Sequence, residues 1–185
     1  ELIEEGGRVV GVKATSPDGE LDIRADLVVG CDGRHSTLRE RAGFAVENLG
    51  APMDILWFRV SRRADDSAEA FGHMEAGMML VMLNRNDYWQ CAYVIPKGGI
   101  DRVKAKGFPA FLEAVVSMSP FLRDRLGEIN GWDDVKLLTV AVDRLTRWHK
   151  PGLLCIGDAA HAMSPIGGVG INLAIQDAVA AANIL

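Results

Sequence analysis

The sequence predicts a mixed α/β (α+β) fold. Two short apolar runs, residues 27–30 and 153–156, each lead into a polar turn and then into a helix-forming segment. Between them lies a block of several β-type runs separated by polar or proline-containing connections. Strand-to-helix units near both ends of the chain, with successive strands between them, predict helices and sheets that share one fold.

Composition narrows the class of protein. The 185 residues are 49% hydrophobic and 24% charged, which is enough chain for a sizeable core. The net charge of -5 does not indicate a protein that binds nucleic acid, because such proteins are usually basic. Cys31, Cys91 and Cys155 lie among apolar neighbours without metal-ligand spacing, so we expect reduced structural thiols and no metal site. No apolar run reaches the length of a membrane span and no signal peptide is recognisable, so we expect a cytoplasmic protein.

The N-terminal segment predicts a hairpin followed by a strand and a short helix. Residues 8–14 and 20–23 are short β-type runs that flank Ser16-Pro17-Asp18-Gly19, a turn sequence. The outgoing strand leads towards residues 27–30, and a helix is expected over residues 36–41.

The most informative segment follows the second apolar run. It reads Gly157-Asp158-Ala159-Ala160-His161, then Pro165, Gly167-Gly168 and Gly170, before the alanine-rich helix-forming residues 171–185. The loop therefore lies at a helix N-terminus, where unpaired backbone N–H groups and the positive end of the dipole favour an electron-rich ligand group. Its glycines allow the backbone to approach that ligand closely.

This segment closely resembles the GD motif of the FAD-dependent aromatic hydroxylase-like monooxygenases, the para-hydroxybenzoate hydroxylase type with its ubiquinone-biosynthesis hydroxylase relatives. The resemblance implies that Asp158 bonds a ribityl hydroxyl of FAD, and that the amides of Ile171 and Asn172 face the pyrimidine edge of the flavin. The alternative is an ordinary strand-loop-helix turn with Asp158 as a local cap. The implied cofactor-binding residues of this segment are Gly157, Asp158, Pro165, Gly167, Gly168, Val169, Gly170, Ile171 and Asn172.

A second segment, residues 25–39 with the sequence ADLVVGCDGRHSTLR, resembles the family's DG motif. In relatives this region lies near the FAD pyrophosphate and has been linked to NAD(P)H binding, which implies such contacts for Asp32, His35 and Arg39. A simpler interpretation remains open for each of two residues. Asp32 caps the helix over residues 36–41, and Arg39 is a solvated surface charge.

The central block resembles the family's substrate-binding sheet in order and pattern. The resemblance implies a partial FAD-binding Rossmann-like domain, formed by residues 1–51 and 146–185, with an inserted β-sheet substrate domain over residues 52–145. Within that block the sequence predicts strands over residues 53–61, 78–83, 88–95 and 135–142, helices over residues 108–118 and 120–126, and a polar connection over residues 62–70.

The aromatic residues of the block have two interpretations. Trp57, Phe58, Trp89 and Tyr93 either line a pocket for a flat apolar substrate or belong to the core. Alternation places Trp89 and Tyr93 on one face of a strand, and because a sheet must bury one face, core packing is favoured. His161 is expected to position the loop and not to act in catalysis.

The resemblance implies an FAD-dependent monooxygenase that takes electrons from NAD(P)H and uses O2, through a flavin C4a-hydroperoxide, to hydroxylate an aromatic or other hydrophobic small molecule. No catalytic side chain is assigned, and a homodimer is compatible with this class. Two alternatives stay open: a related FAD-dependent halogenase, reductase or epoxidase, and a flavin-free remnant or interaction module. The chain starts at Glu1 and contains no Gly-x-Gly-x-x-Gly after a first strand, so we expect a middle fragment that is inactive by itself.

Overall fold

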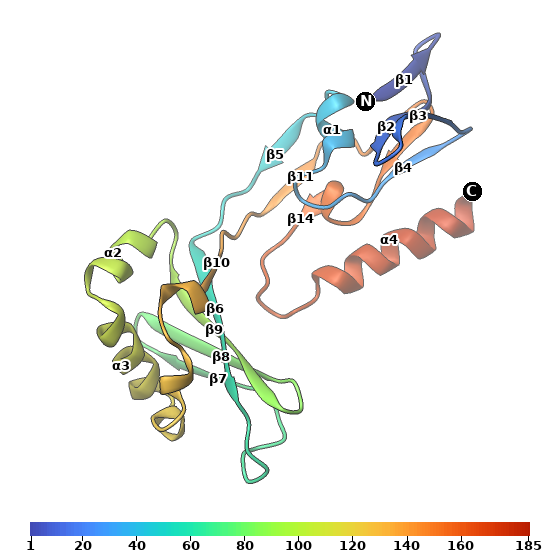
Figure 1. Cartoon of the computed structure of the whole chain (residues 1–185). Helices are drawn as coiled ribbons and strands as arrows, with labels where there is room; N and C mark the ends of the chain where they lie inside the picture. Colours follow the sequence, from blue (N-terminus) through green and yellow to red (C-terminus); the bar gives the residue numbers. More distant parts are fainter. The chain divides into compact units, whose positions relative to one another are not determined.

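The computed structural model covers residues 1–185 and divides into two compact units (Figure 1). Unit 1 consists of Glu1–Gly50 and Ala141–Leu185, and unit 2 is the continuous segment Ala51–Val140. Unit 2 is therefore an insertion into unit 1. FAD binding by residues 1–51 and 146–185, and substrate binding by residues 52–145, stay predictions.

Unit 1 combines three small sheets with two helices (Figure 1). The sheets have the strand orders β1-β2-β3, β14-β11-β5 and β12-β13-β4. The elements are β1 (Leu2–Glu5), β2 (Arg8–Ser16), β3 (Gly19–Arg24), β4 (Val28–Gly30), α1 (Thr37–Arg41), β5 (Val46–Asn48), β11 (Asp143–Leu145), β12 (His149–Lys150), β13 (Leu153–Cys155), η4 (Gly157–Ala159), β14 (His161–Ala162) and α4 (Gly170–Ile184).

The expected hairpin is confirmed. β2 and β3 pair antiparallel up to Ser16↔Gly19, so Pro17 and Asp18 form a two-residue turn. Gly19 follows with φ 125°, a backbone conformation that a residue with a side chain rarely adopts. β1 pairs with the other edge of β2 and completes a three-stranded meander.

One parallel pair of strands joins the two ends of the chain. β13 lies parallel to β4, with Leu153 opposite Val28 and Cys155 opposite Gly30. Val28 and Leu153 are buried together with Val9 of β2. Because both apolar runs enter this small core, the polar turns that follow them leave the sheet at the same edge.

Unit 2 is built on a five-stranded antiparallel sheet of order β10-β6-β9-β8-β7 (Figure 1). Its elements are β6 (Met53–Ser61), β7 (Phe71–Glu75), β8 (Met78–Asn84), β9 (Tyr88–Pro96), α2 (Ile100–Ala105), α3 (Phe108–Met118), η1 (Pro120–Leu122), η2 (Leu126–Glu128), η3 (Trp132–Asp134) and β10 (Lys136–Leu138).

The core of unit 2 lies between one face of this sheet and α3. Phe58, Trp89 and Tyr93 are all buried in it, which confirms the prediction of core packing for these aromatic residues. The ring of Phe111 in α3 meets the rings of Phe58 and Tyr93 edge-on, with centroids 5.7 and 5.6 Å apart. Trp57 is only partly buried and alternates onto the opposite face of the sheet.

Three local predictions were wrong. The helix expected over residues 120–126 is two separate 3₁₀ turns, Pro120–Leu122 and Leu126–Glu128, each of a single turn. The strand expected over residues 135–142 is only Lys136–Leu138, because the chain passes from unit 2 to unit 1 after Val140 and pairs again as β11. The third wrong prediction concerns Cys31, which was expected to be a structural thiol but is exposed. Cys91 and Cys155 are buried, and burial raises the pKa of Cys91 to about 12 and that of Cys155 to about 11.

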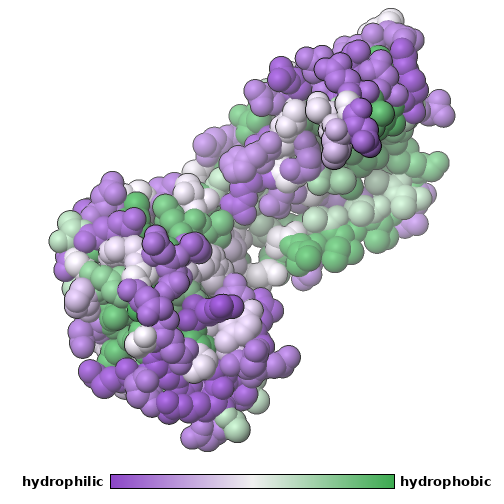
Figure 2. Space-filling view, viewed as in Figure 1, coloured by the Kyte–Doolittle hydropathy of each residue, from purple (hydrophilic) through white to green (hydrophobic).

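α4 exposes an apolar stripe. Ile171, Ile175 and Val179, four residues apart, are 69%, 55% and 54% exposed. Figure 2 shows hydrophobic surface, in green, along this helix. The side that touches the rest of unit 1 carries smaller residues, among them Ala174 and Asp177. No helix of the structure is both long enough and apolar enough to cross a membrane.

Candidate cofactor site in unit 1

The two motif segments meet at the carboxyl ends of β4 and β13. Their parallel pairing continues one residue beyond the strands, where Ile156 N donates to Gly30 O at 2.9 Å. Neighbouring strands lie about 4.8 Å apart, so the turns at Asp32 and Asp158 start side by side. This edge is where open α/β sheets bind their ligands.

Asp158 offers a carboxylate without a partner. It lies in the single 3₁₀ turn Gly157–Ala159 that follows β13, and its side chain is half-buried. The carboxylate makes no hydrogen bond or ion pair within the chain. Asp158 therefore does not cap its own turn, and its oxygens are free to accept hydrogen bonds from a ligand.

Asp177 of α4 holds this turn in place. Its Oδ2 atom accepts a hydrogen bond from Gly157 N at 2.8 Å and lies 2.6 Å from His161 Nε2. The ring of His161 also packs against Trp148, with centroids 5.0 Å apart and the ring planes tilted by 36°. Both partners of the Asp177 carboxylate come from the loop, which supports a positioning role for His161.

Gly157 allows α4 to approach the turn. It adopts φ 57°, and a Cβ atom at this position would lie 3.1 Å from Ala174 Cβ. A side chain would therefore add both backbone strain and crowding against the helix.

Pro165 to Gly168 form a turn with bare backbone. Gly168 N donates to Pro165 O at 3.0 Å, and Gly167 and Gly168 have φ values of 85° and 64°. A Cβ atom at either glycine would meet nothing within 4 Å, so both face open space. A ligand can approach this main chain directly.

The N-terminus of α4 leaves several donors unpaired. The helix starts at Gly170, its N-cap Val169 provides no side-chain hydrogen bond, and Leu173 N is the amide that donates to Val169 O. The N–H groups of Gly170, Ile171 and Asn172 precede the first helical hydrogen bond and are therefore available to a ligand. The helix dipole favours negative charge at the same place.

In the other motif, the Asp32 carboxylate is used within the chain. Asp32 Oδ1 accepts from Ser36 Oγ at 2.5 Å and Oδ2 accepts from Leu38 N at 3.2 Å, while Ser36 Oγ caps α1 by accepting from Arg39 N. Burial opposes ionisation, but these hydrogen bonds outweigh it and lower the pKa of Asp32. The bonds are those of a helix cap, and a cofactor contact from Asp32 stays a prediction.

Arg39 is not the solvated surface charge of the simpler interpretation. Its side chain is 13% exposed, its Nη1 lies 3.2 Å from Asp143 Oδ1 in β11, and it also donates to the Arg34 carbonyl. His35 is exposed in the turn before α1. A nucleotide contact from either residue stays a prediction.

The spacing of the cysteines in the sequence predicts no metal site. The structure contains no group of three or more His, Cys, Asp or Glu residues arranged to hold a metal ion.

The residues present fit a dinucleotide cofactor. Parallel strands end in two adjacent turns, and these offer an unpaired carboxylate, bare glycine backbone and uncapped helix amides. Residues 2–185 match the FAD binding domain family, so the chain belongs to that family. The resemblance to FAD-dependent hydroxylases is confirmed.

Several relatives match nearly the whole chain. It is 38% identical to the 6-methylpretetramide 4-monooxygenase of Streptomyces rimosus, over 100% of this chain and 44% of that protein. It is 27% identical to the 3-demethoxyubiquinol 3-hydroxylase of Escherichia coli K12, over 90% of this chain and 42% of that protein. The chain thus spans less than half of the length of these relatives.

Solved structures share the fold. PqsL, a probable FAD-dependent monooxygenase from Pseudomonas aeruginosa, matches 99% of this chain and 51% of its own, with a TM-score of 0.78 and 21% identity. The flavin-dependent brominase Bmp2 matches 95% of this chain and 46% of its own, with a TM-score of 0.74 and 20% identity. At these identities the likeness concerns the fold alone.

Proposed function

We propose that the protein to which this chain belongs is an FAD-dependent monooxygenase that uses NAD(P)H and O2 to hydroxylate an aromatic or other hydrophobic small molecule. The main observation behind this proposal is the parallel pairing of β4 and β13, because it brings the segments that follow these strands, at Asp32 and Asp158, to one edge of a sheet in unit 1. The names of the relatives support the reaction class, since they include a 4-monooxygenase and a 3-hydroxylase. A cytoplasmic location and a homodimer remain part of the proposal.

Each loop feature has a task in holding the cofactor. The Asp158 carboxylate would accept hydrogen bonds from polyol hydroxyls, and the bare backbone at Gly167 and Gly168 would let the ligand approach closely. The amides of Ile171 and Asn172 would donate to an electron-rich edge of the ring system. FAD, when bound, supplies the transfer of electrons from NAD(P)H and the activation of O2.

The chain itself contributes orientation and electrostatics. The uncapped start of α4 is a preorganised group of donors that stabilises negative charge developing nearby, most strongly where water is excluded. Pro165 limits the freedom of the loop before that helix start. Asp177 ties the loop to the helix through Gly157 and His161, so both parts of the site keep one geometry.

The test uses the full-length protein. Its absorption spectrum shows whether flavin is bound, and NADH and NADPH oxidation is followed together with O2 uptake in the presence of a quinol or a polycyclic phenol. We expect bound flavin, consumption of NAD(P)H and O2, and a product heavier by one oxygen atom. Purified protein without flavin would contradict the proposal. Turnover that requires bromide or chloride would assign halogenation, the chemistry of the brominase whose fold is shared.

A further inference from the structure

One side of α4 packs against the loop that follows β13. Gly170, Ala174 and Asp177 are spaced four and three residues apart, so they lie on the same side of the helix. A Cβ atom at Gly170 would lie 3.5 Å from Met163 Cγ, and one at Gly157 would lie 3.1 Å from Ala174 Cβ. The helix and the loop are therefore in close contact over about two helical turns.

Asp177 makes the polar contact on this side of α4. Its Oδ2 atom accepts a hydrogen bond from Gly157 N at 2.8 Å, and His161 Nε2 lies 2.6 Å from the same oxygen. The side chains of Asp177 and His161 are only 17% and 18% exposed, so water competes little for these hydrogen bonds. Apolar contacts between small residues have no preferred direction, whereas hydrogen bonds do. Asp177 therefore fixes the position of α4 along the loop.

The position of α4 determines the distance between two parts of the cofactor site. Asp158 lies in the 3₁₀ turn whose first amide Asp177 bonds, and the unpaired amides lie in the first turn of α4. Asp177 follows Gly170 by seven residues, which is two turns or roughly 10 Å along the helix. It is thus too far along α4 to bond a ligand group at the first turn. A shift of the helix would nevertheless move the unpaired amides relative to Asp158.

We propose that Asp177 is a positioning residue that sets the reduction potential of the bound flavin, because it holds the first amides of α4 in place. Reduction increases the negative charge of a flavin, and preorganised N–H donors at a helix start stabilise that charge. Amides that have moved stabilise it less, so the flavin becomes harder to reduce. This role rests on the proposed function, because it requires that unit 1 holds FAD at this edge of the sheet.

Two substitutions of Asp177 separate positioning from the direct effect of its charge. In the full-length flavoprotein, Asp177→Ala should weaken the binding of oxidised FAD about tenfold. It should also lower the reduction potential by about 30 mV, which corresponds to a tenfold smaller preference for the reduced form in a two-electron couple. Asp177→Asn keeps an oxygen that can accept from both Gly157 N and His161 Nε2, so its affinity and potential should stay close to those of the wild type.

The direction of the shift identifies the cause. If Asp177 acted only through its negative charge, both variants would raise the potential, because removing that charge favours the more negative, reduced flavin. FAD affinity is measured by fluorescence titration of the flavin-free protein, and the potential by anaerobic reduction in the presence of a reference dye. Equal shifts of the potential in Asp177→Ala and Asp177→Asn, or no shift in either, would overturn the positioning role.

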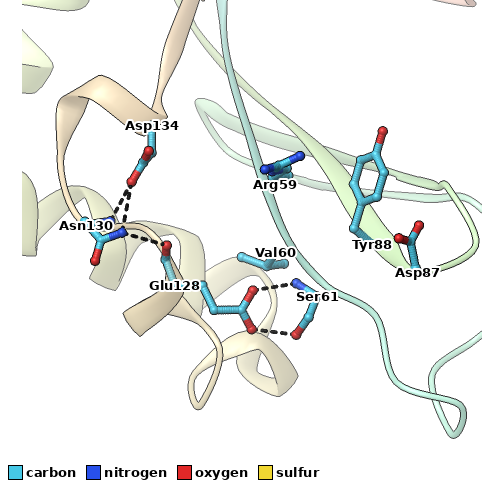
Figure 3. Close-up of a pocket in the computed structure, with 8 residues that line it drawn as sticks. All are labelled: Arg59, Val60, Ser61, Asp87, Tyr88, Glu128, Asn130 and Asp134. Carbon is cyan, nitrogen blue, oxygen red and sulfur yellow. Dashed lines mark hydrogen bonds between the residues drawn. The ribbon is translucent and has the colours of Figure 1, made fainter.

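Glu128 of unit 2 provides a matched control. Like Asp177, it bonds a backbone amide and a side chain, since Glu128 Oε2 accepts from Ser61 N at 2.7 Å and Oε1 accepts from Ser61 Oγ at 2.5 Å (Figure 3). Neither of these groups belongs to the loop or to α4. Glu128→Ala should therefore leave the affinity for FAD and the reduction potential unchanged. A potential lowered as much as in Asp177→Ala would show a general effect of instability and overturn the positioning role.

A second variant keeps the test decisive if circular dichroism shows that Asp177→Ala does not fold. His161→Ala removes one of the two hydrogen bonds and retains the Asp177 charge, so it should lower the potential by a smaller amount, and an unchanged potential would overturn the positioning role.

The positioning role and the proposed reaction fail in different ways. A flavin potential that depends on Asp177, in a protein that hydroxylates no substrate, would uphold the role and reject the reaction. Hydroxylation together with equal potentials in the wild type and Asp177→Ala would uphold the reaction and reject the role. Purified protein without flavin would reject both.

Discussion

At the residue scale, three aspartates of unit 1 differ in whether their carboxylates bond other groups of the chain. Asp177 bonds the Gly157 amide and His161, and Asp32 bonds Ser36 and a helix amide. Asp158 alone among these three has no partner in the chain. A ligand hydroxyl can donate the hydrogen bond that this half-buried carboxylate does not receive within the chain, which makes Asp158 the most direct probe of the cofactor site.

We predict that Asp158→Ala in the full-length protein lowers its flavin content much more than Asp18→Ala does. The loss of a hydrogen bond to a ligand hydroxyl, which is then left unpaired, costs about 1–3 kcal/mol. Asp18 lies in the exposed β2–β3 turn and serves as the control. Flavin absorbance per protein after purification and dialysis is the measurement. Equal flavin content in the two variants would remove Asp158 from the site.

Arg39 requires a paired test because Asp143 already contacts its guanidinium. We predict that Arg39→Ala slows flavin reduction by NAD(P)H because a nucleotide phosphate contact is lost, whereas Asp143→Asn slows it less. Anaerobic stopped-flow reduction over a range of NADH and NADPH concentrations measures the apparent nucleotide affinity of both variants. Matching losses would indicate that Arg39 acts through its contact with β11, and unchanged affinity would leave it with a structural role.

At the element scale, an ion pair anchors the connection between β6 and β7. Arg125 lies between η1 and η2 and forms a two-pronged contact with both oxygens of Asp66, and the two side chains are 4% and 6% exposed. Asp66 Oδ2 also accepts from Arg63 N at 2.9 Å and from Trp89 Nε1 at 3.0 Å. One carboxylate thus ties a long polar connection to the core of unit 2.

We predict that Asp66→Asn destabilises the protein by about 3–5 kcal/mol at pH 7, because it leaves the buried Arg125 charge without its counter-ion. The exposed neighbour Asp65→Asn is the control, with an expected change within about 0.5 kcal/mol. Urea unfolding followed by tryptophan fluorescence gives both values. A loss below about 1 kcal/mol would show that the pair is solvated in solution.

The same pair gives a pH dependence with a definite sign. The hydrogen bonds from Arg125 lower the pKa of Asp66 far below the usual aspartate value of about 3.9, although desolvation acts in the opposite direction. A lowered folded-state pKa means that the stabilisation is fully present above about pH 4 and is lost as the pH falls further. The stability difference between the wild-type protein and Asp66→Asn should therefore be constant from pH 7 to pH 5 and shrink below pH 4.

At the scale of the whole molecule, the sequence predicts local elements far better than their partners. The turn at Pro17 and Asp18, the strand of residues 53–61 and the buried Trp89 follow from local periodicity and turn chemistry. The Asp177 contacts reach 20 and 16 residues back along the chain, and the Arg39 contact with Asp143 spans 104. Asp177 is the single charged residue of α4, and this was the available signal for its role.

The contacts that close the inserted unit are also non-local. Asp54, near the start of β6, is 3% exposed and accepts hydrogen bonds from Gly98 N at 2.8 Å and from Val140 N at 2.9 Å. Lys97 Nζ lies 2.9 Å from the same carboxylate and also donates to the Val140 carbonyl. The first and last strands of unit 2 are thus joined at their ends within the unit itself.

We therefore predict that residues 51–140, expressed alone, fold cooperatively. The segment is continuous, it contains its own core between the sheet and α3, and Asp54 joins its two ends without any residue of unit 1. Asp54→Ala should lower the unfolding free energy of the isolated segment by about 1–3 kcal/mol, because the buried amide of Val140 loses its acceptor. Amide NMR dispersion and a single urea transition are the measurements, with the exposed Asp101→Ala as control. A collapsed segment without dispersed amide signals would show that the insertion depends on the surrounding chain for its structure.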